Sequence, residues 1–306
     1  MEIRTLATGL RFPEGPIALD DGGVLLVEIA RGTLTKVTAE GKVEVVAEPG
    51  GGPNGAAVGP DGAVYICNNG GCFTWEDVAG FTLPGPLPDS WTGGCIQRVD
   101  VGTGEVTTLY TESSGRPLRA PNDLVFDAYG GFWFTDHGVR AERTSDRTGL
   151  HYAKPDGSSC VEVVFPCDAP NGIGLSPDGS TLYAAETHTG RVFQWPILGP
   201  GEVPPSPLPI GNGGMLLAAA PGADLFDSLA VDGEGWVCVG TLVNGGITAI
   251  SPDGGTVDFI PLPDPLVTNI CFGGPDLRTA FVTLSGTGQL AAIDWPRKGL
   301  RLQHTL

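Results

Sequence analysis

Basic residues are scarce in this chain. Its 306 residues contain 17 Lys and Arg against 35 Asp and Glu, which gives a formal net charge of −18. Proteins that bind nucleic acid need clustered positive charge to meet the phosphates, so a nucleic-acid partner is disfavoured. An acidic surface keeps a protein soluble and also attracts cations. Both interpretations remain open from the charge alone.

Long hydrophobic segments are also missing. No stretch approaches the roughly 18 apolar residues that a membrane-spanning helix requires, and the first residues, MEIRTLATGLRF, carry no apolar signal-peptide segment. No window shows the spacing of three and four residues that marks an amphipathic helix. We therefore expect no membrane partner, a cytoplasmic location and little helix.

Paired cysteine motifs and nucleophile motifs are absent too. The seven cysteines include no CxxC pair, which disfavours a zinc-finger arrangement. Cys67, Cys72 and Cys95 bracket one segment, and a disulfide among them is an alternative that the sequence leaves open. No GxSxG motif or Ser–His–Asp order is found, which disfavours a covalent acyl-enzyme.

Glycine and proline are abundant instead, and a short phrase recurs along the chain. There are 48 Gly and 27 Pro, with 41% apolar residues, which is enough for a large core. Each copy of the phrase has an oxygen-bearing residue, an apolar run, a turn and a second apolar run. The copies are PEGPIALDDGGVLLVE (13–28), PNGAAVGPDGAVYICN (53–68), PNDLVFDAYGGFWFTD (121–136), PNGIGLSPDGSTLYAAE (170–186), FDSLAVDGEGWVCVG (226–240) and VTNICFGGPDLRTAFVT (267–283).

The repeat predicts an all-β architecture. Six copies give about fifty residues per unit, a period typical of propellers and solenoids. Each copy reads as two strands joined by a tight turn, and further strands follow each pair. Four antiparallel strands per unit favour a six-bladed β-propeller, formed by residues 1–306 as one domain, over a solenoid. Residues 3–8 precede the first copy and are expected to complete the last sheet and close the ring.

The second position of the phrase predicts the site. It holds Glu14, Asn54, Asn122, Asn171, Asp227 and, with a weaker match, Thr268. In a propeller these positions begin the strands nearest the axis, so their side chains should converge on one face. Two carboxylates, from Glu14 and Asp227, and the amide oxygens of Asn122 and Asn171 are ligands for one hard divalent cation. We expect Ca²⁺ first, with Mg²⁺, Mn²⁺ or Zn²⁺ as alternatives.

The same face, which we call the mouth, should carry the ends of the second strands and one long insertion. Residues 69–94 form a connection far longer than a hairpin needs, and such loops are often functional. Their aromatic residues predict a lid or a side of the mouth, with a packed loop or an interface as the alternative. The strand ends expected at the mouth are Glu28, Asn68, Asn69, Asp136, His137, Glu186, His188, Thr241 and Thr283.

Asn122 is also a candidate substrate contact, and three further residues are candidates for this role. His137 follows the strand of the third copy, where it could reach a substrate. Arg119 lies three residues before Asn122 and could pair with a substrate carboxylate, although such an arginine often anchors a loop instead. Asn54 could touch substrate or support the cation ligands.

The repeated phrases resemble the SMP-30/gluconolactonase/LRE family over roughly residues 10–285. The resemblance rests on PEGP, PNDLVFDAYGGFWFTD, PNGIGLSPDGSTLY, FDSLAVDGEGWVCVG and CFGGPDLRTAFVT, in that order. It implies a six-bladed propeller with one axial divalent metal held by Glu14, Asn122, Asn171 and Asp227. It also implies hydrolysis of a sugar-acid lactone or related small lactone, with Asp227 as the base.

Two departures from the family pattern bear on the substrate. Phe134-Thr135-Asp136-His137 stands where many relatives have FTDP, and the 69–94 insertion is longer than expected. The alternatives to a lactonase are a phosphotriesterase-like metal hydrolase and a non-catalytic propeller that binds calcium or a protein. We expect a monomer or a weak homo-oligomer.

Overall fold

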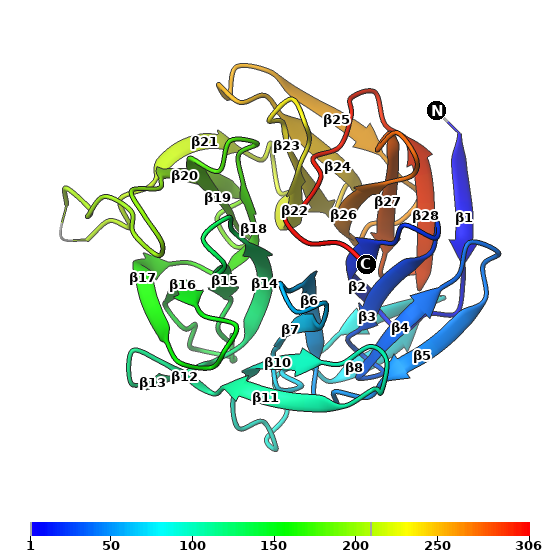
Figure 1. Cartoon of the computed structure of the whole chain (residues 1–306), viewed down its shortest axis with the longest axis horizontal. Coiled ribbons are helices and arrows are strands. Elements are labelled where there is room, and N and C mark those ends of the chain that lie inside the picture. Colours follow the sequence, from blue (N-terminus) through cyan, green and yellow to red (C-terminus); the bar gives the residue numbers. More distant parts are fainter. Residues whose placement is uncertain (1, 209) are drawn as a thin grey trace.

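The computed structural model describes residues 2–208 and 210–306, and these residues form strands and turns without a helix. Six four-stranded antiparallel sheets are arranged around one centre (Figure 1). The fold is therefore a six-bladed β-propeller, as the repeat predicts. The described chain contains no helix of a length and apolarity that could span a bilayer.

Each blade runs from an inner strand at the centre to an outer strand at the rim. Blade one comprises β2 (Pro13–Ala18), β3 (Val24–Glu28), β4 (Thr33–Val37) and β5 (Val43–Ala47); blade two comprises β6 (Pro53–Val58), β7 (Val64–Asn68), β10 (Cys95–Val99) and β11 (Val106–Tyr110). Blade three comprises β14 (Pro121–Phe126), β15 (Phe132–Asp136), β16 (Thr148–Ala153) and β17 (Cys160–Cys167); blade four comprises β18 (Pro170–Leu175), β19 (Thr181–Glu186), β20 (Arg191–Pro196) and β21 (Met215–Ala219). Blade five comprises β22 (Leu225–Val231), β23 (Val237–Leu242), β24 (Gly246–Ile250) and β25 (Val257–Pro261); blade six comprises β26 (Val267–Gly273), β27 (Thr279–Leu284), β28 (Gln289–Asp294) and β1 (Ile3–Ala7).

The N-terminal strand closes the ring. β1 pairs antiparallel with β28, and Ile3 lies opposite Ile293 (Figure 1). The two ends of the propeller are therefore held together by a sheet, which leaves no open edge between the last and the first blade. This confirms the predicted closure.

The apolar residues of the repeat fill the spaces between adjacent blades. Six hydrophobic clusters are found, one for each of the six blade–blade interfaces. Between blades two and three, for example, Tyr65 packs with Phe126 and Phe132 at ring-centroid distances of 5.1 and 5.8 Å. The alternation of each strand thus buries both faces of a blade, and only the turns and the outer strands remain exposed.

The tight turns of the repeat lie on the face opposite the mouth, which we call the rear face. In Pro177-Asp178-Gly179, the glycine has a φ of +70°, and Asp178 Oδ1 accepts a hydrogen bond from the backbone N–H of Ser180. The aspartates of the P-D-G turns, which include Asp61 and Asp253, therefore shape turns, as their sequence context predicts.

Candidate active site

All six inner strands carry a β-bulge at their mouth end. In blade three, Asn122 and Asp123 together oppose the single residue Thr135, because Pro121 pairs with Asp136 and Leu124 pairs with Phe134. The other five inner strands also shift register at this end, although in blade one Glu14 still pairs with Val27 and the shift follows it. A bulge re-aims the side chains of the extra residue and its neighbour. The predicted ligand position and the position after it therefore both face the interior of the ring.

The inner strands pack very closely around the axis. Each contacts its two neighbours, so β2, β6, β14, β18, β22 and β26 form a closed ring. A Cβ on Gly55 would lie 2.5 Å from the carbonyl oxygen of Asn122, and one on Gly172 would lie 2.4 Å from the backbone nitrogen of Leu229. Glycine directly after the ligand position is what permits this approach in blades two and four.

Glu14 is buried in the ring with one oxygen occupied and one free. Oε2 accepts hydrogen bonds from the Gly15 backbone N–H and from Asn269 Nδ2, each with a donor–acceptor distance of 2.6 Å. Oε1 is buried and has no hydrogen-bond partner among the described residues. A buried carboxylate oxygen without a partner is costly, so Oε1 is available to a ligand.

The two asparagines also present oxygens. Asn122 Oδ1 is buried and unpartnered within residues 2–208 and 210–306. Asn171 donates from Nδ2 to Thr187 Oγ1 over 3.0 Å and accepts at Oδ1 from Ser228 Oγ over 3.2 Å. These two bonds fix the orientation of the Asn171 amide, with its oxygen on the side of blade five.

Asp227 completes this group. It is partly exposed, whereas Glu14, Asn122 and Asn171 are only 2%, 6% and 4% exposed. Burial and then the nearby Glu14 carboxylate raise the pKa of Asp227 well above its usual range. Burial also raises the pKa of Glu14. Two neighbouring carboxylates that are shielded from water repel each other when both are charged. A bound cation would stabilise their charged forms.

These observations fit a hard divalent cation. Glu14 and Asn122 supply unpartnered buried oxygens, Asn171 supplies an oriented amide, and Asp227 supplies a second carboxylate. Oxygen ligands of this kind select Ca²⁺, Mg²⁺ or Mn²⁺. Asn54 is buried at the equivalent position of blade two, and no hydrogen bond of its side chain is found in the described parts of the chain. It therefore stays a candidate contact.

A second layer of polar residues lies beside the predicted ligand positions and was not predicted from the sequence. The position after each ligand position reads Gly15, Gly55, Asp123, Gly172, Ser228 and Asn269. Where this residue is polar, it bonds to a neighbouring blade: Asp123 accepts from the Ile173 N–H, Ser228 donates to Asn171, and Asn269 donates to Glu14. This variation along the repeat was visible in the sequence and is the signal that could have found these residues.

Blade six also differs from the prediction at Thr268. Its hydroxyl is shared with those of Thr283 and Ser285, at 2.9 and 2.5 Å. Asn269, the next residue, supplies the polar atom that reaches Glu14. The bulge in β26 holds one residue more than its partner strand, which places Asn269 opposite Thr283 and turns it towards blade one.

Four of the strand-end residues expected at the mouth, Glu28, Asn68, Asp136 and Glu186, have buried side chains. Their side chains accept backbone N–H groups from the segment that leads into the inner strand of the same blade. Glu28 binds Arg11 N, Asn68 binds Gly52 N, Asp136 binds Arg119 N and Ala120 N, and Glu186 binds Asp168 N. These residues fix the start of each inner strand and so position the ligands indirectly.

The 69–94 insertion lies on the mouth face and contains the hairpin of β8 (Trp75–Val78) and β9 (Phe81–Pro84). Trp75 packs on Phe12 of blade one with ring centroids 5.0 Å apart, and the Thr82 N–H bonds to Gly286 of blade six. At its other end, Trp91 stacks on Arg119 of blade three, 4.5 Å from the guanidinium carbon to the ring centroid. The insertion therefore borders the mouth from blade six to blade three.

Arg119 is engaged in this contact. Besides the stacking on Trp91, its Nε donates to Asp146 Oδ2 over 2.8 Å. The anchoring role of Arg119, which the sequence left open, is thus the one that the geometry supports.

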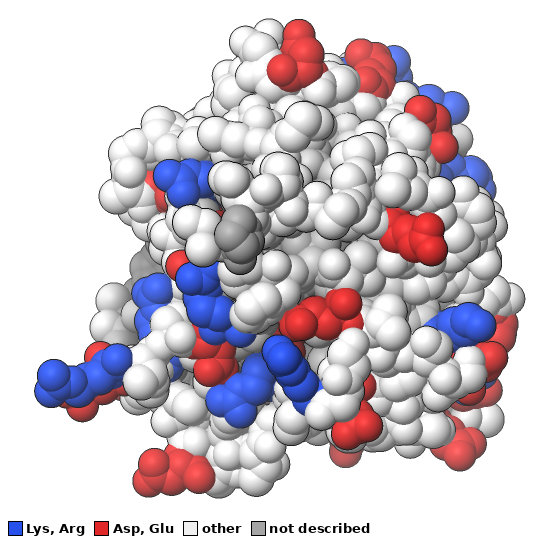
Figure 2. Space-filling view, turned by 90° about the vertical axis from the view of Figure 1, so that its left-hand side faces the viewer, with Lys and Arg blue, Asp and Glu red and all other residues white. Residues whose placement is uncertain are grey.

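Figure 2 shows the side of the molecule formed by blades three and four, where Lys and Arg side chains gather. The arginines between residues 116 and 147 are Arg116, Arg119, Arg140, Arg143 and Arg147.

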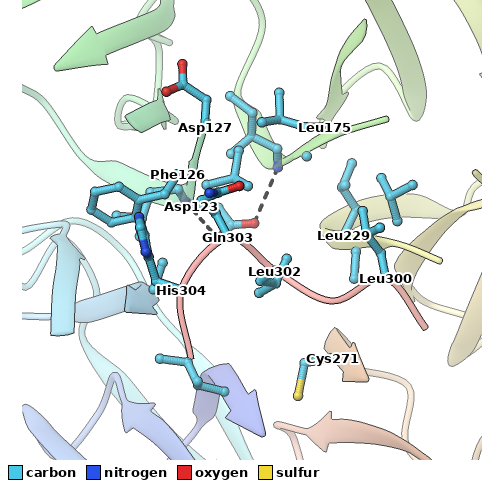
Figure 3. A pocket seen from close by; sticks show the side chains of 18 of the residues that line it. Asp123, Phe126, Asp127, Leu175, Leu229, Cys271, Leu300, Leu302, Gln303 and His304 are labelled. Carbon is cyan, nitrogen blue, oxygen red and sulfur yellow. Dashed lines mark hydrogen bonds between the residues drawn. The ribbon is translucent and has the colours of Figure 1, made fainter. Parts of the chain in front are cut away.

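A separate pocket of about 240 Å³ lies on the rear face, behind the ring. It is lined mainly by apolar residues of the inner strands and by the C-terminal segment 300–304. Figure 3 shows this segment crossing the pocket, with His304 next to Phe126 and Leu300 next to Leu229. Asp123 lines this pocket, and its burial and then the nearby Glu14 carboxylate raise its pKa well above the usual range.

Fold and site together define a six-bladed β-propeller with an oxygen-lined centre on its axis. Residues 12–286 match the family described as the SMP-30/gluconolactonase/LRE-like region, and the chain belongs to this family. The gluconolactonase of Zymomonas mobilis is 25% identical, with 92% of this chain and 79% of that protein covered. The 6-deoxy-6-sulfogluconolactonase of Pseudomonas putida is 29% identical over 75% of this chain and 74% of its own.

Solved structures agree on the fold. A gluconolactonase from Xanthomonas campestris superposes with a TM-score of 0.75 at 23% identity and covers 96% of this chain and 89% of its own. The calcium-binding protein regucalcin from Agrobacterium tumefaciens superposes with a TM-score of 0.72 at 20% identity and covers 98% of each chain. The six-bladed architecture is thus that of known propellers of similar size.

Proposed function

We propose that the protein is a divalent-metal-dependent hydrolase that opens the ring of a lactone. Its membership of a family with named lactonases supports the reaction class. The observation that carries the metal dependence is the pair of buried, unpartnered oxygens, Glu14 Oε1 and Asn122 Oδ1. They lie in the same ring of inner strands as Asp227, and a cation would satisfy both oxygens.

Each residue has a distinct part in this proposal. Glu14, Asn122, Asn171 and Asp227 would hold the cation, which supplies Lewis-acid polarisation of the lactone carbonyl when bound. Asp227 is the carboxylate that remains partly exposed at the mouth, so it accepts the proton of the attacking water. Glu14 is hydrogen-bonded and buried, so it is confined to the role of ligand. Asn54 and His137 contact the substrate.

The environment of the cysteines supports a cytoplasmic location for this activity. All seven, including Cys67, Cys72 and Cys95, are free thiols, so none of the disulfides left open by the sequence forms. Free thiols of this number are typical of reducing compartments. The named lactonases among the relatives support a small-molecule lactone as the substrate, and we expect a monomer or a weak homo-oligomer.

Hydrolysis of a lactone panel tests the proposed function. Metal-free protein, prepared with EDTA and dialysis, is assayed on sugar, aryl and aliphatic lactones and on an aryl phosphotriester. Each assay is run without metal and with added Ca²⁺, Mg²⁺, Mn²⁺ or Zn²⁺. The proposal expects lactone hydrolysis only after metal is returned. Full activity in verified metal-free protein contradicts the metal mechanism. Hydrolysis of the phosphotriester alone supports the alternative hydrolase, and cation binding without turnover supports a non-catalytic propeller.

A further inference from the structure

Two histidines meet at the mouth between blades three and four. His137 follows β15, and His188 lies two residues beyond β19. Their rings are T-shaped, with centroids 5.4 Å apart and planes at 76°. From the sequence, His137 is a candidate substrate contact and His188 is expected at the mouth, but their pairing is not predicted.

The hydrogen bonds of these rings fix which nitrogen carries the proton. His137 Nδ1 lies 3.1 Å from the backbone oxygen of Gly138, and His188 Nδ1 lies 3.0 Å from Asp168 Oδ1. Both partners are acceptors, so each Nδ1 must donate its hydrogen. In a neutral imidazole the other nitrogen, Nε2, then has a free lone pair and can only accept.

Both rings are held in the neutral form. Burial lowers the pKa of His137 to about 4, and the charges of Arg140 and a protonated His188 act in the same direction. Burial and Arg140 also lower the pKa of His188, against the opposing effect of Asp168. These are the charged groups that bear on the pair, and the rings are therefore acceptors at neutral pH.

The two Nε2 atoms are open. Neither makes a hydrogen bond with any residue in the ranges 2–208 and 210–306, and neither is among the buried unpartnered atoms there. A partly buried acceptor pair that is reachable from solvent is ready to receive hydrogen-bond donors.

The histidine pair stands beside the asparagines of the axial ring. The backbone N–H of His137 bonds to the carbonyl of Ala120, two residues before Asn122. His188 follows Thr187, whose hydroxyl accepts from Asn171 Nδ2. A molecule held at the axial centre and extending between blades three and four would therefore pass beside the histidine pair.

We propose that His137 and His188 form a hydroxyl-binding subsite, in which each Nε2 accepts a hydrogen bond from a hydroxyl group on the lactone. The inference rests on the proposed lactonase function. An unsubstituted aliphatic lactone would leave both acceptors without donors in a partly desolvated place, and sites built to bind a hydroxyl discriminate strongly against analogues that lack it. His137 and His188 thus determine specificity, and the preferred lactone is polyhydroxylated.

The test compares two lactones of the same ring size on metal-loaded enzyme. For His137→Phe and His188→Phe, kcat/KM for glucono-δ-lactone should fall about tenfold, whereas kcat/KM for δ-valerolactone should change less than about threefold. His188→Gln, which keeps an acceptor oxygen near the position of Nε2, should recover part of the preference. His304→Phe makes the same substitution on the rear face and should leave both rates unchanged. Equal losses on the two lactones, or no loss on either, would overturn the subsite.

A binding measurement separates this inference from the proposed function. Glucono-δ-lactam, a non-hydrolysable amide with the same hydroxyls, is titrated calorimetrically into metal-loaded wild type and the two Phe variants. Binding to the wild type that weakens about tenfold in the variants supports the subsite even if no lactone is hydrolysed. Equal binding to all three proteins contradicts it, whatever the outcome of the lactone assays. The unfolding temperature of each variant, measured with the cation bound, confirms that the variant is folded.

Discussion

Asn269 Nδ2 donates a hydrogen bond to Glu14 Oε2 over 2.6 Å, across the junction between the last blade and the first. The Gly15 N–H occupies the same oxygen. Glu14 is therefore left with Oε1 as its one available oxygen. The Asn269 side chain thereby determines which oxygen of this carboxylate can bind a cation. Partners of this kind orient a ligand without touching the metal.

Replacing Asn269 should weaken cation binding. In Asn269→Leu, Glu14 loses a donor and can rotate, so the dissociation constant for Ca²⁺ should rise about 10- to 100-fold, measured by calorimetry on chelated protein. Asn244→Leu is the matched control, because Asn244 Nδ2 makes the equivalent bond to Asp224 Oδ2 in blade five, away from the axis. If both variants bind Ca²⁺ like the wild type, Asn269 does not position Glu14.

Substitutions of Glu14 and Asp227 should have different effects, because Glu14 acts only as a cation ligand and Asp227 also acts as the base. Glu14→Gln lowers cation affinity, and its lactone hydrolysis should recover substantially at saturating cation. Asp227→Asn keeps an oxygen ligand but cannot take a proton, so kcat should fall about 10²- to 10⁴-fold even at full occupancy. Steady-state kinetics at several cation concentrations distinguish the two. Wild-type kcat in cation-saturated Asp227→Asn would rule out Asp227 as the base.

The close packing of the inner strands makes Gly55 intolerant of a side chain. A Cβ there would lie 2.5 Å from the Asn122 carbonyl oxygen and 2.6 Å from the Asp123 Cα. Gly55→Ala should lower the free energy of unfolding by about 1–3 kcal/mol, measured by chemical denaturation. At Gly102 the nearest atom, Asp100 Oδ1, is 3.4 Å away, so Gly102→Ala serves as the control. Equal stability of the two variants would show that the ring can expand.

Buried neutral histidine predicts a loss of stability in weak acid. Burial lowers the pKa of His151 from 6.5 to about 3, and its ring packs on Phe134 with centroids 4.8 Å apart. Between these pH values the unfolded chain binds a proton that the folded protein does not. Stability is therefore present above pH 6.5 and is lost as the pH falls, with a slope of about 1.4 kcal/mol per pH unit for this one group.

His151→Phe should remove that contribution. The free energy of unfolding is measured by denaturant titration from pH 7 to pH 4 in both proteins. The variant should show a shallower decline, because only the other titrating groups remain. His137, whose pKa is lowered to about 4, contributes in the same direction in both proteins and cancels in the comparison. Parallel pH curves would mean that the His151 ring protonates in the folded state.

Arg119 should hold the insertion in place. Arg119→Lys keeps the charge but loses the planar guanidinium group that stacks on Trp91 and donates a hydrogen bond to Asp146. Amide hydrogen exchange within residues 69–94 should become faster, while Ca²⁺ affinity stays unchanged. The outcome against this account is unchanged exchange together with a raised KM for charged lactones, which would assign Arg119 to substrate binding.

Much of the fold could be predicted because the repeat is regular. The apolar alternation, the turns and the six copies were enough for six blades, and even the closing strand at Ile3–Ala7 followed from the count of strands. The second position of the repeat lies in the ring of inner strands, since its place at the start of each inner strand depends only on topology. The convergence of Glu14 and Asp227 needs no further information.

The contacts between blades could not be predicted in the same way. Asn269 reaches Glu14 because a bulge in β26 turns it, and the bulges leave no clear mark in the apolar pattern. Glu28 and Asp136 were expected at the mouth, but the backbone N–H groups that they accept come from loops without a regular pattern. Likewise, the pairing of His137 with His188 depends on loop geometry at the ends of two separate blades.

The most direct test is the titration of Ca²⁺ into chelated protein, followed by calorimetry, for the wild type and Glu14→Gln. The account predicts saturable binding of one cation per chain in the wild type and at least about tenfold weaker binding in the variant, which loses the carboxylate charge. Unfolding temperatures with and without Ca²⁺ should show the same difference. Absence of saturable binding in the wild type, or equal affinity in the two proteins, would contradict a cation centre on the propeller axis.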